Sequence, residues 1–515
     1  MKYKIRTILA ASCLLLGMSS CNDWLDVEPS TEVDKGALFE NEDGFADAMA
    51  GVYSNMTSDN LYGKNLTWYA VELMGGGATC MFGNNANYMA FSFQPNADYY
   101  MDNLRNSFVD KVWNEQYNTI ANVNSVLSDI DEKQGVFVGD DYKVFKGEAL
   151  GLRAFLHFDL LRLFGKAGQE NLDTKAIPYE TALSSQVYPM LTVKQAAEAM
   201  LTDLKEAKEL LKYDPMYTGG TCSKYVCGKV TGDATYRTRY HIADWHNRRF
   251  HFNYYAAVAT MARIYEWIGD KENALACAKE VIDAQEDKFP WVNPTLVANV
   301  PSTSQYVSRD RTFCTEQIFA LNITDLPDRM DGYMIAKANS FTGENGNLEG
   351  INTDCFDAST RAQDPRYAYL RTSYNYYGMD FAISTKFYED NDYNNSYSPW
   401  SADRMPLIRL SEMYYIAAEC EPDLVKAIAY LEAVRQNRGM SAYPLNCSSK
   451  EDLQAEIGKE YAKEFIAEGQ FFYYKKRLGQ TIINKTAYDA YTIQPELCVL
   501  PIPDDENMYG GRTEK

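Results

Sequence analysis

The middle of the chain contains two amphipathic stretches separated by a short break. Residues 253–284 read NYYAAVATMARIYEWIGDKENALACAKEVIDA. Apolar residues recur at three- and four-residue steps, which places their side chains on one face of an α-helix; the first stretch supplies Ala257, Val258, Met261, Ile264, Tyr265 and Ile268. Gly269-Asp270 interrupts this pattern, and Ala274, Ala278, Val281 and Ile282 resume it. The segment therefore predicts two helices joined by a tight turn, with small residues where they cross.

The same pattern recurs along the chain. A second clear pair spans 407–436, and its break is Glu421-Pro422-Asp423. Looser matches are indicated by apolar stripes at 104–130, 145–163 and 192–211, the last opened by Thr192 and Gln195 at capping-box spacing. Such pairs are similar to tetratricopeptide repeats, whose period is about 34 residues. We predict a mainly α fold, an α-α superhelix with four tetratricopeptide-type helix pairs.

Long insertions separate these helices. They are rich in Gly, Asn, Asp, Ser and Tyr, and they span 62–103, 214–250, 285–350 and 351–405. Gln317–Leu321 resembles a short strand, so minor β structure is expected here. Loops of this length usually carry binding or interface residues.

Composition excludes two broad classes. The 515 residues are 46% hydrophobic, enough apolar surface to offset the entropy of ordering, so the chain is not disordered. The net charge is −21 and the sequence pI is about 4.8. Nucleic-acid binding needs a concentrated group of Lys and Arg side chains, and the excess of acidic residues opposes it, so a nucleic-acid-binding protein is excluded. A large globular protein is predicted.

The N-terminus has the pattern of an export signal. Lys2, Lys4 and Arg6 precede a short apolar run from Ile8 to Gly17, which is shorter than the ~20 residues of a membrane span. Small residues then lead into Cys21, as in bacterial lipoprotein signals. We expect 1–20 to be a signal peptide, Cys21 to be lipidated and 21–515 to form one domain anchored only by its lipid. The acidic residues after Cys21 resemble surface-export signals of Bacteroidetes lipoproteins.

The sequence favours neither a metal site nor a cofactor. Cys13 and Cys21 belong to the N-terminal signal, so an odd number of the 11 cysteines remains and they cannot all form disulfides. Cys222 and Cys227 lie close together in the sequence and are the plausible local disulfide. Asp390 opens a calcium-like loop, but Asn395 and Ser401 stand where the EF-hand pattern needs Gly and Glu. His157 lies in an apolar helical pattern and is expected to be a core residue, as are Trp68, Trp113, Trp267 and Trp291.

Several further motifs occur in a characteristic order. Besides the acidic segment after Cys21, these are GFADAMAGVY (44–53), GEALGLRAF (147–155), PLIRLSEMY (406–414), AVRQNRG (433–439), EFIAEGQ (464–470), KKRLG (475–479) and LPIP (500–503). In this order the chain resembles the RagB/SusD family of outer-membrane nutrient-binding lipoproteins. The segment 464–474 departs from the usual tail motif of that family, which leaves the ligand open.

The resemblance implies a SusD-like helical superhelix with long ligand-facing loops and no catalysis. It divides the domain into an N-terminal SusD-like part at about 21–215 and a C-terminal RagB/SusD part at about 250–515. It implies an oligosaccharide ligand, or less often a peptide, at the cell surface, and a SusC-like TonB-dependent transporter as partner. In this interpretation the charged residues of the motifs form internal pairs; they are Glu148, Arg153, Glu412, Glu464 and Glu468.

A glycan site needs flat aromatic rings for sugar faces and polar groups for hydroxyls. The loops supply both, and the candidate ligand-binding residues are Tyr88, Asn96, Asp98, Tyr99, Tyr100, Tyr333, Phe341, Tyr374 and Tyr376. For each ring, packing of its loop on the helical body is the open alternative. An anionic ligand needs a local basic pocket, for which Arg361 with Arg366, or Arg248 with Arg249, are the candidates.

Two other classes of protein remain open on the sequence alone. A retaining glycoside hydrolase needs two carboxylates about 5 Å apart, and 71 acidic residues are present. A repeat scaffold for protein partners is compatible with a lipid anchor.

Overall fold

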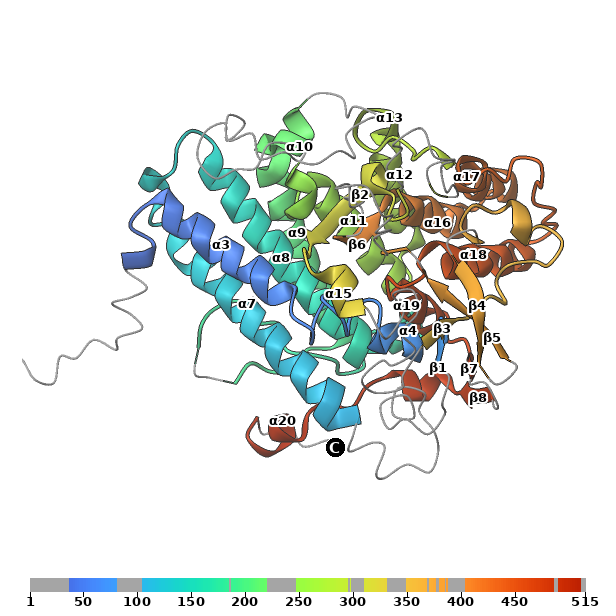
Figure 1. Cartoon of the computed structure of the whole chain (residues 1–515). Helices are drawn as coiled ribbons and strands as arrows, with labels where there is room; N and C mark the ends of the chain where they lie inside the picture. Colours follow the sequence, from blue (N-terminus) through green and yellow to red (C-terminus); the bar gives the residue numbers. More distant parts are fainter. Residues whose placement is uncertain are drawn as a thin grey trace, which may run out of the picture.

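The computed structural model describes residues 37–80, 104–184, 187–219, 247–294, 297, 310–330, 349–367, 370–376, 379–384, 386–387, 403–485 and 490–510. For 79–80, 349–350, 370–376, 379–383 and 485, the backbone alone is described. The chain is mainly helical, as predicted, with a few short strands (Figure 1).

The N-terminal half is a layer of long helices packed side by side (Figure 1). In packing order they are α3 (Glu42–Met56), α7 (Asp110–Ile130), α8 (Asp141–Phe164) and α9 (Val193–Leu210). A short π-helical turn, Arg105–Val109, leads into α7. Thr192 caps α9 with a capping box: its hydroxyl accepts from the Gln195 N–H, and the Gln195 side chain accepts from the Thr192 N–H. This confirms the predicted start of that helix.

Helix α8 differs from the prediction. The apolar stripe at 145–163 predicts an amphipathic helix, but every residue from Gly147 to Phe164 is buried. Helices α7, α9 and α11 (Tyr254–Trp267) all pack against it, so this part of α8 has no solvent face. The polar residues of α8 from Glu148 onward are therefore buried too.

The C-terminal half continues the stack of helices. Helices α11 (Tyr254–Trp267) and α12 (Lys271–Asp283) form the first predicted pair, and α16 (Leu410–Cys420) and α17 (Leu424–Asn437) form the second. Gly269 has a φ of 79°, which favours glycine, and the Asp270 and Asp423 side chains cap α12 and α17. Helix α12 packs on α16, α18 (Lys450–Glu464) packs on α16, and α19 (Gln470–Arg477) packs on α18. The packing order fits the tetratricopeptide-type expectation.

The strands form two-stranded antiparallel sheets within the described residues. Strand β2 (Gln317–Asn322), at the predicted strand-like run, pairs with β6 (Arg404–Arg409), which leads directly into α16. The other sheets are β1 (Ala78–Cys80) with β3 (Glu349–Ile351), β4 (Leu370–Tyr376) with β5 (Met379–Ser384) and β7 (Ile482–Lys485) with β8 (Ala490–Ile493). The remaining short helices are α4 (Ala70–Met74), α10 (Pro215–Thr218), α13 (Gln285–Lys288), α15 (Leu326–Met330) and α20 (Asp504–Met508).

The predicted aromatic core is confirmed. Trp68, Trp113 and Trp267 are buried, although Trp68 lies in turns before α4 rather than in a helix. Trp291 packs on Tyr414 with ring centroids 5.1 Å apart. No helix in the described part of the chain is both long enough and apolar enough to cross a bilayer.

Candidate functional site

Most of the predicted ligand-binding residues lie outside the described residues. These are Tyr88, Asn96, Asp98, Tyr99 and Tyr100 in 81–103, and Tyr333 and Phe341 in 331–348. Cys21, the Cys222 and Cys227 pair, and the loop opened by Asp390 also lie outside them. Tyr374 and Tyr376 lie on β4, where they stand opposite Phe381 and Met379 of β5 in the strand register.

One flanking residue of each loop segment lies in the same two-stranded sheet. Cys80, the last residue before 81–103, pairs across the β1–β3 ladder with Glu349, the first residue after 331–348. Segments more than 200 residues apart in the sequence therefore join the body at a single rung.

The third predicted segment joins the body beside this rung. Strand β3 contacts β5, the hairpin partner of β4, and β1 contacts β7 (lower right in Figure 1). The backbone of Tyr374 and Tyr376 is thus part of the same group of strands. The sequence predicts these segments from their composition, and the structure shows that Cys80, Glu349 and the β4–β5 hairpin lie close together.

A groove opens next to these strands, between α18 and α19. Its volume is about 400 Å³, within the ~300–1,000 Å³ range of small-molecule sites. Gly76 and Gly77 precede β1 and line one wall, and Asn352, Asp354 and Cys355 follow β3. Helices α18 and α19 and the chain leading into β7 complete the lining, with Gln454, Ala455, Gly458, Lys459, Ala462, Phe471, Lys475, Gln480, Thr481 and Ile483. We call this the α18–α19 groove.

Sequence reasoning missed this groove. Lys475 was noticed as part of the KKRLG motif, but nothing in the motif's spacing shows that β1, β3 and α18 surround it. A second hollow, of about 590 Å³, lies between α12, α16 and α18 and is lined by Leu275, Pro422 and Ile457 among others. Its lining is mostly apolar and shares Gln454 with the α18–α19 groove.

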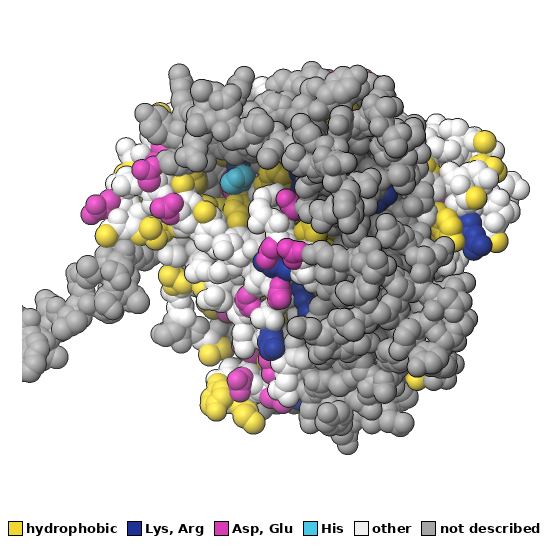
Figure 2. Space-filling model, in the orientation of Figure 1, with side chains coloured by type: hydrophobic (Ala, Val, Ile, Leu, Met, Phe, Trp, Pro, Cys, Tyr) yellow, Lys and Arg dark blue, Asp and Glu magenta, His cyan; other side chains and the backbone are white. Residues whose placement is uncertain are grey.

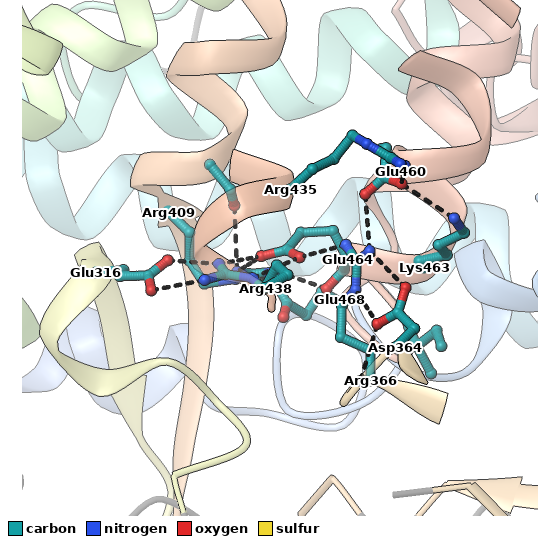
Figure 3. A network of polar contacts seen from close by, with 12 residues as sticks. Glu316, Asp364, Arg366, Arg409, Arg435, Arg438, Glu460, Lys463, Glu464 and Glu468 are labelled. Atoms are coloured by element: carbon teal, nitrogen blue, oxygen red, sulfur yellow. Dashed lines mark hydrogen bonds and ion pairs between the residues drawn. The ribbon is translucent and has the colours of Figure 1, made fainter. Parts of the chain in front are cut away.

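The charged residues of the C-terminal motifs form a buried network (Figure 3). Glu464 lies at its centre and accepts from Arg366 at 2.9 Å, from Arg409 at 2.6 Å and from Arg438 at 2.6 Å. Burial alone would raise the pKa of Glu464, but the ion pairs with Arg438 and Arg409 outweigh it and hold the pKa well below its usual range. All four side chains are essentially inaccessible to solvent.

Other carboxylates extend the network. Glu316 binds Arg438 through both carboxylate oxygens, and Glu468 pairs with Arg409 and with Lys386. Glu460 pairs with Arg366, Arg435 and Lys463. Although burial opposes ionisation, these cations hold the pKa of Glu460 at about 2. The prediction that Glu464 and Glu468 are internally paired is confirmed.

A second network joins α8 to residues before α11. Glu148 accepts from Arg248 at 2.6 Å and from Tyr53 at 2.5 Å, and His251 Nδ1 lies 2.9 Å from the same carboxylate. Arg248 also binds Asp214. The pairs of Arg153 with Asp203 and of Arg263 with Glu412 are likewise buried. The predicted internal roles of Glu148, Arg153 and Glu412 are confirmed.

The predicted basic pockets are wrong. Arg248 and Arg366 are buried and bound to carboxylates, and buried Arg249 donates to the Cys314 and Lys288 carbonyls. Arg361 is exposed near the Tyr367 ring, 5.4 Å from its centroid. On the described part of the face in Figure 2, acidic and basic side chains lie close together, without a broad basic surface.

His157 is a core residue, as predicted. Its Nδ1 lies 2.8 Å from the Arg153 carbonyl, and its Nε2 accepts from the Glu180 N–H at 2.9 Å. Burial lowers the pKa of His157 to about 3, so the ring is neutral. Over the residues that the structure describes, no group of three His, Cys, Asp or Glu side chains is placed to hold a metal ion.

Comparison with known proteins now places the chain. A family model described as "Starch-binding associating with outer membrane" (SusD-like_3) matches residues 23–223, and the SusD family model (SusD_RagB) matches 317–496. The SusD-like protein P25 of Formosa agariphila is 21% identical over 98% of this chain and 96% of its own length.

Solved structures have the same fold. A SusD superfamily protein from Bacteroides thetaiotaomicron aligns with a TM-score of 0.66 at 21% identity, over 91% of this chain and 98% of that chain. A protein described as a putative sugar binding protein from Bacteroides vulgatus aligns with a TM-score of 0.62 at 22% identity, over 91% and 96% respectively. The family models match both halves of the sequence and these relatives span nearly all of it: the chain belongs to the SusD family.

Proposed function

We propose that this protein binds oligosaccharides at the cell surface and delivers them to a SusC-like TonB-dependent transporter. The observation that carries the proposal is the rung formed by Cys80 and Glu349, because these two residues adjoin 81–103 and 331–348, which contain candidate rings, and the rung lies beside the β4–β5 hairpin. The resulting site takes its rings from 81–103, 331–348 and β4. The family description and the sugar-binding relative support a carbohydrate as the ligand.

The protein acts by binding and not by catalysis in this proposal. Glycoside hydrolysis needs two carboxylates free to donate a proton and to attack or activate water. The acidic residues of the family motifs do not meet this need, because Glu148, Glu412, Glu464 and Glu468 are held in buried ion pairs.

Glycan binding is tested by isothermal titration calorimetry with maltoheptaose, xylohexaose and mannohexaose. We expect a Kd between micromolar and millimolar for at least one of them, with a negative heat-capacity change from ring burial. Replacing Tyr99 and Tyr100 together by alanine should weaken binding about 30-fold, because two stacked rings contribute about 2 kcal/mol.

The matched control is Tyr509→Ala. Tyr509 is 81% exposed beside α20, where hydrophobic side chains gather at the lower left of Figure 2, and its loss should leave binding unchanged. Unchanged binding by the Tyr99 and Tyr100 variant would contradict the proposed site. Release of sugar at enzymatic rates would contradict the binding function, and binding of peptides instead of glycans would reassign the ligand.

We also propose that residues 1–20 are removed and that Cys21 carries the lipid that anchors the protein to the outer membrane. Each methylene of an acyl chain that is buried in the membrane contributes about 0.8 kcal/mol to anchoring. A protein that lacks the acyl chains loses this contribution. In cells fed a labelled fatty acid, the protein should be labelled and should remain with outer-membrane fractions. The Cys21→Ala variant should not be labelled and should be absent from the outer-membrane fractions. If the variant is still labelled, or still found in those fractions, Cys21 is not the anchor.

A further inference from the structure

The α18–α19 groove contains a cation that has no anionic partner among the described residues. Lys475 projects from α19 into the groove, is half-buried, and has its Nζ 4.3 Å from the centre of the Phe471 ring. Among the residues that the structure describes, no carboxylate or carbonyl accepts a hydrogen bond from this ammonium group. Burial lowers the pKa of Lys475 to about 8, since the charged form has lost part of its hydration.

The other charged groups of the groove do not neutralise Lys475. Lys459 is committed elsewhere, because it pairs with Glu456 at 2.8 Å and lies 3.5 Å from Asp357. Asp354 lies on the wall that follows β3 and does not contribute to the altered pKa of Lys475. The Cys355 thiol is buried, which raises its pKa to about 12 and keeps it neutral. Lys475 is therefore the positive group that a ligand in this groove would meet.

The surroundings suit a sugar ring as well as an anion. Phe471 supplies an aromatic ring beside Lys475, and it stacks on Tyr474 with an interplanar angle of 12°. Gln480 and Thr481 stand exposed at the edge of the groove, where an amide and a hydroxyl can bond sugar hydroxyls. A few polar groups around an apolar surface are typical of small-molecule sites.

We propose that the α18–α19 groove binds a sugar residue that carries an oxyanion, either a carboxylate or a sulfate, and that Lys475 Nζ donates to its oxygens. This inference rests on the proposed function and specifies its substrate class. A partly desolvated ammonium forms a stronger hydrogen bond to an oxyanion than to a neutral hydroxyl, because both partners are then charged. Because the whole chain has a net charge of −21, the attraction is local to this groove.

The test compares an acidic sugar with its neutral ester and with a sulfated sugar. We would titrate the full chain with galacturonic acid trimer, with the methyl ester of the same trimer, and with galactose 6-sulfate. The acid trimer should bind at least about tenfold more tightly than its ester, which corresponds to one charge-assisted hydrogen bond. Binding of the sulfated sugar but not of the acid would assign the oxyanion as sulfate; the reverse would assign it as carboxylate.

Variants tie this preference to one side chain. Lys475→Met keeps the apolar stem and should abolish the difference between acid and ester, while Lys475→Arg should retain it. Lys459→Met is the matched control, because it removes the same charge from the same groove, and it should change the acid affinity by less than about threefold. Circular dichroism spectra would confirm that each variant is folded.

Each other outcome overturns the inference. It fails if neither the acid trimer nor galactose 6-sulfate binds more tightly than the ester, if Lys475→Met keeps the preference, or if Lys459→Met loses it equally. It also fails if no anionic sugar binds at about 10 mM, where a millimolar site is nearly saturated. Its failure is distinct from failure of the proposed function. If neutral glycans bind and their binding depends on Tyr99 and Tyr100 but not on Lys475, the proposed function stands and the groove proposal fails. If only acidic sugars bind and their binding depends on Lys475, the groove proposal stands and the proposed site on the loops fails.

Discussion

Replacing Glu464 by glutamine is expected to lower the free energy of unfolding by about 3–5 kcal/mol, the usual cost of removing one partner from a buried ion pair. The glutamine keeps the shape but removes the negative charge that Arg366, Arg409 and Arg438 share. Glu316, Glu460 and Glu468 still pair with these arginines, one each. Glu460 and Glu468, however, also neutralise Arg435, Lys463 and Lys386. Three guanidinium groups would then lie in a solvent-free region with too little opposing charge.

Urea denaturation followed by circular dichroism measures this effect as a lower midpoint. Glu456→Gln is the control, because Glu456 pairs with the partly exposed Lys459 and its loss should cost less than about 1 kcal/mol. The pH dependence has a defined sign. The pKa of Glu464 is depressed in the folded state, so its contribution is present above the ordinary glutamate pKa of about 4.3 and disappears as pH falls through the folded value. Equal midpoints for wild type and variant at neutral pH would contradict the role assigned to Glu464.

The Gly469→Ala substitution should destabilise the protein by about 3 kcal/mol, from backbone strain and overlap together. Gly469 precedes α19 with a φ of 72°, a conformation that L side chains rarely adopt. An alanine Cβ there would lie 2.4 Å from Val71 Cγ2 and 2.6 Å from the Thr67 carbonyl oxygen. The Gly469 N–H also donates to Glu72 at 3.1 Å, so a backbone shift would break a buried hydrogen bond.

Gly479→Ala separates the two contributions. Gly479 has a φ of 59°, but no atom lies within 4 Å of a Cβ built there. It should therefore show the strain alone, about 1–2 kcal/mol. Thermal unfolding of both variants gives the comparison, and equal losses would mean that the N-terminal segment containing Thr67 and Val71 does not pack tightly on the start of α19.

Local signals in the sequence predicted the helices well. The apolar spacing in 253–284, the break at Gly269 and the cap at Thr192 all correspond to structure, because each depends on residues within a turn or two of one another. Helix α8 shows where this reasoning fails. Periodicity reveals that one face is apolar, but whether the opposite face meets water depends on how many neighbours pack there.

Tertiary structure also decided which charged side chains are buried in ion pairs. The sequence predicts that Glu464 is paired internally and that Arg366 or Arg248 belongs to a basic ligand pocket. In the folded chain Arg366 is one of the partners of Glu464, 98 residues away, and Arg248 is bound to Glu148, 100 residues away. A residue's type gives its possible partners, but whether it is buried is set by distant segments.

The sequence by itself determined the helical frame, the turns that divide it and the order of motifs that marks the SusD family, since all of these are local or linear properties. Tertiary structure alone decided that Cys80 and Glu349, which adjoin 81–103 and 331–348, pair with each other, and that Lys475 faces a groove in which no described residue is its anionic partner. The physical reason is range: helix periodicity and capping act over a few residues, whereas a groove is made by the approach of segments hundreds of residues apart.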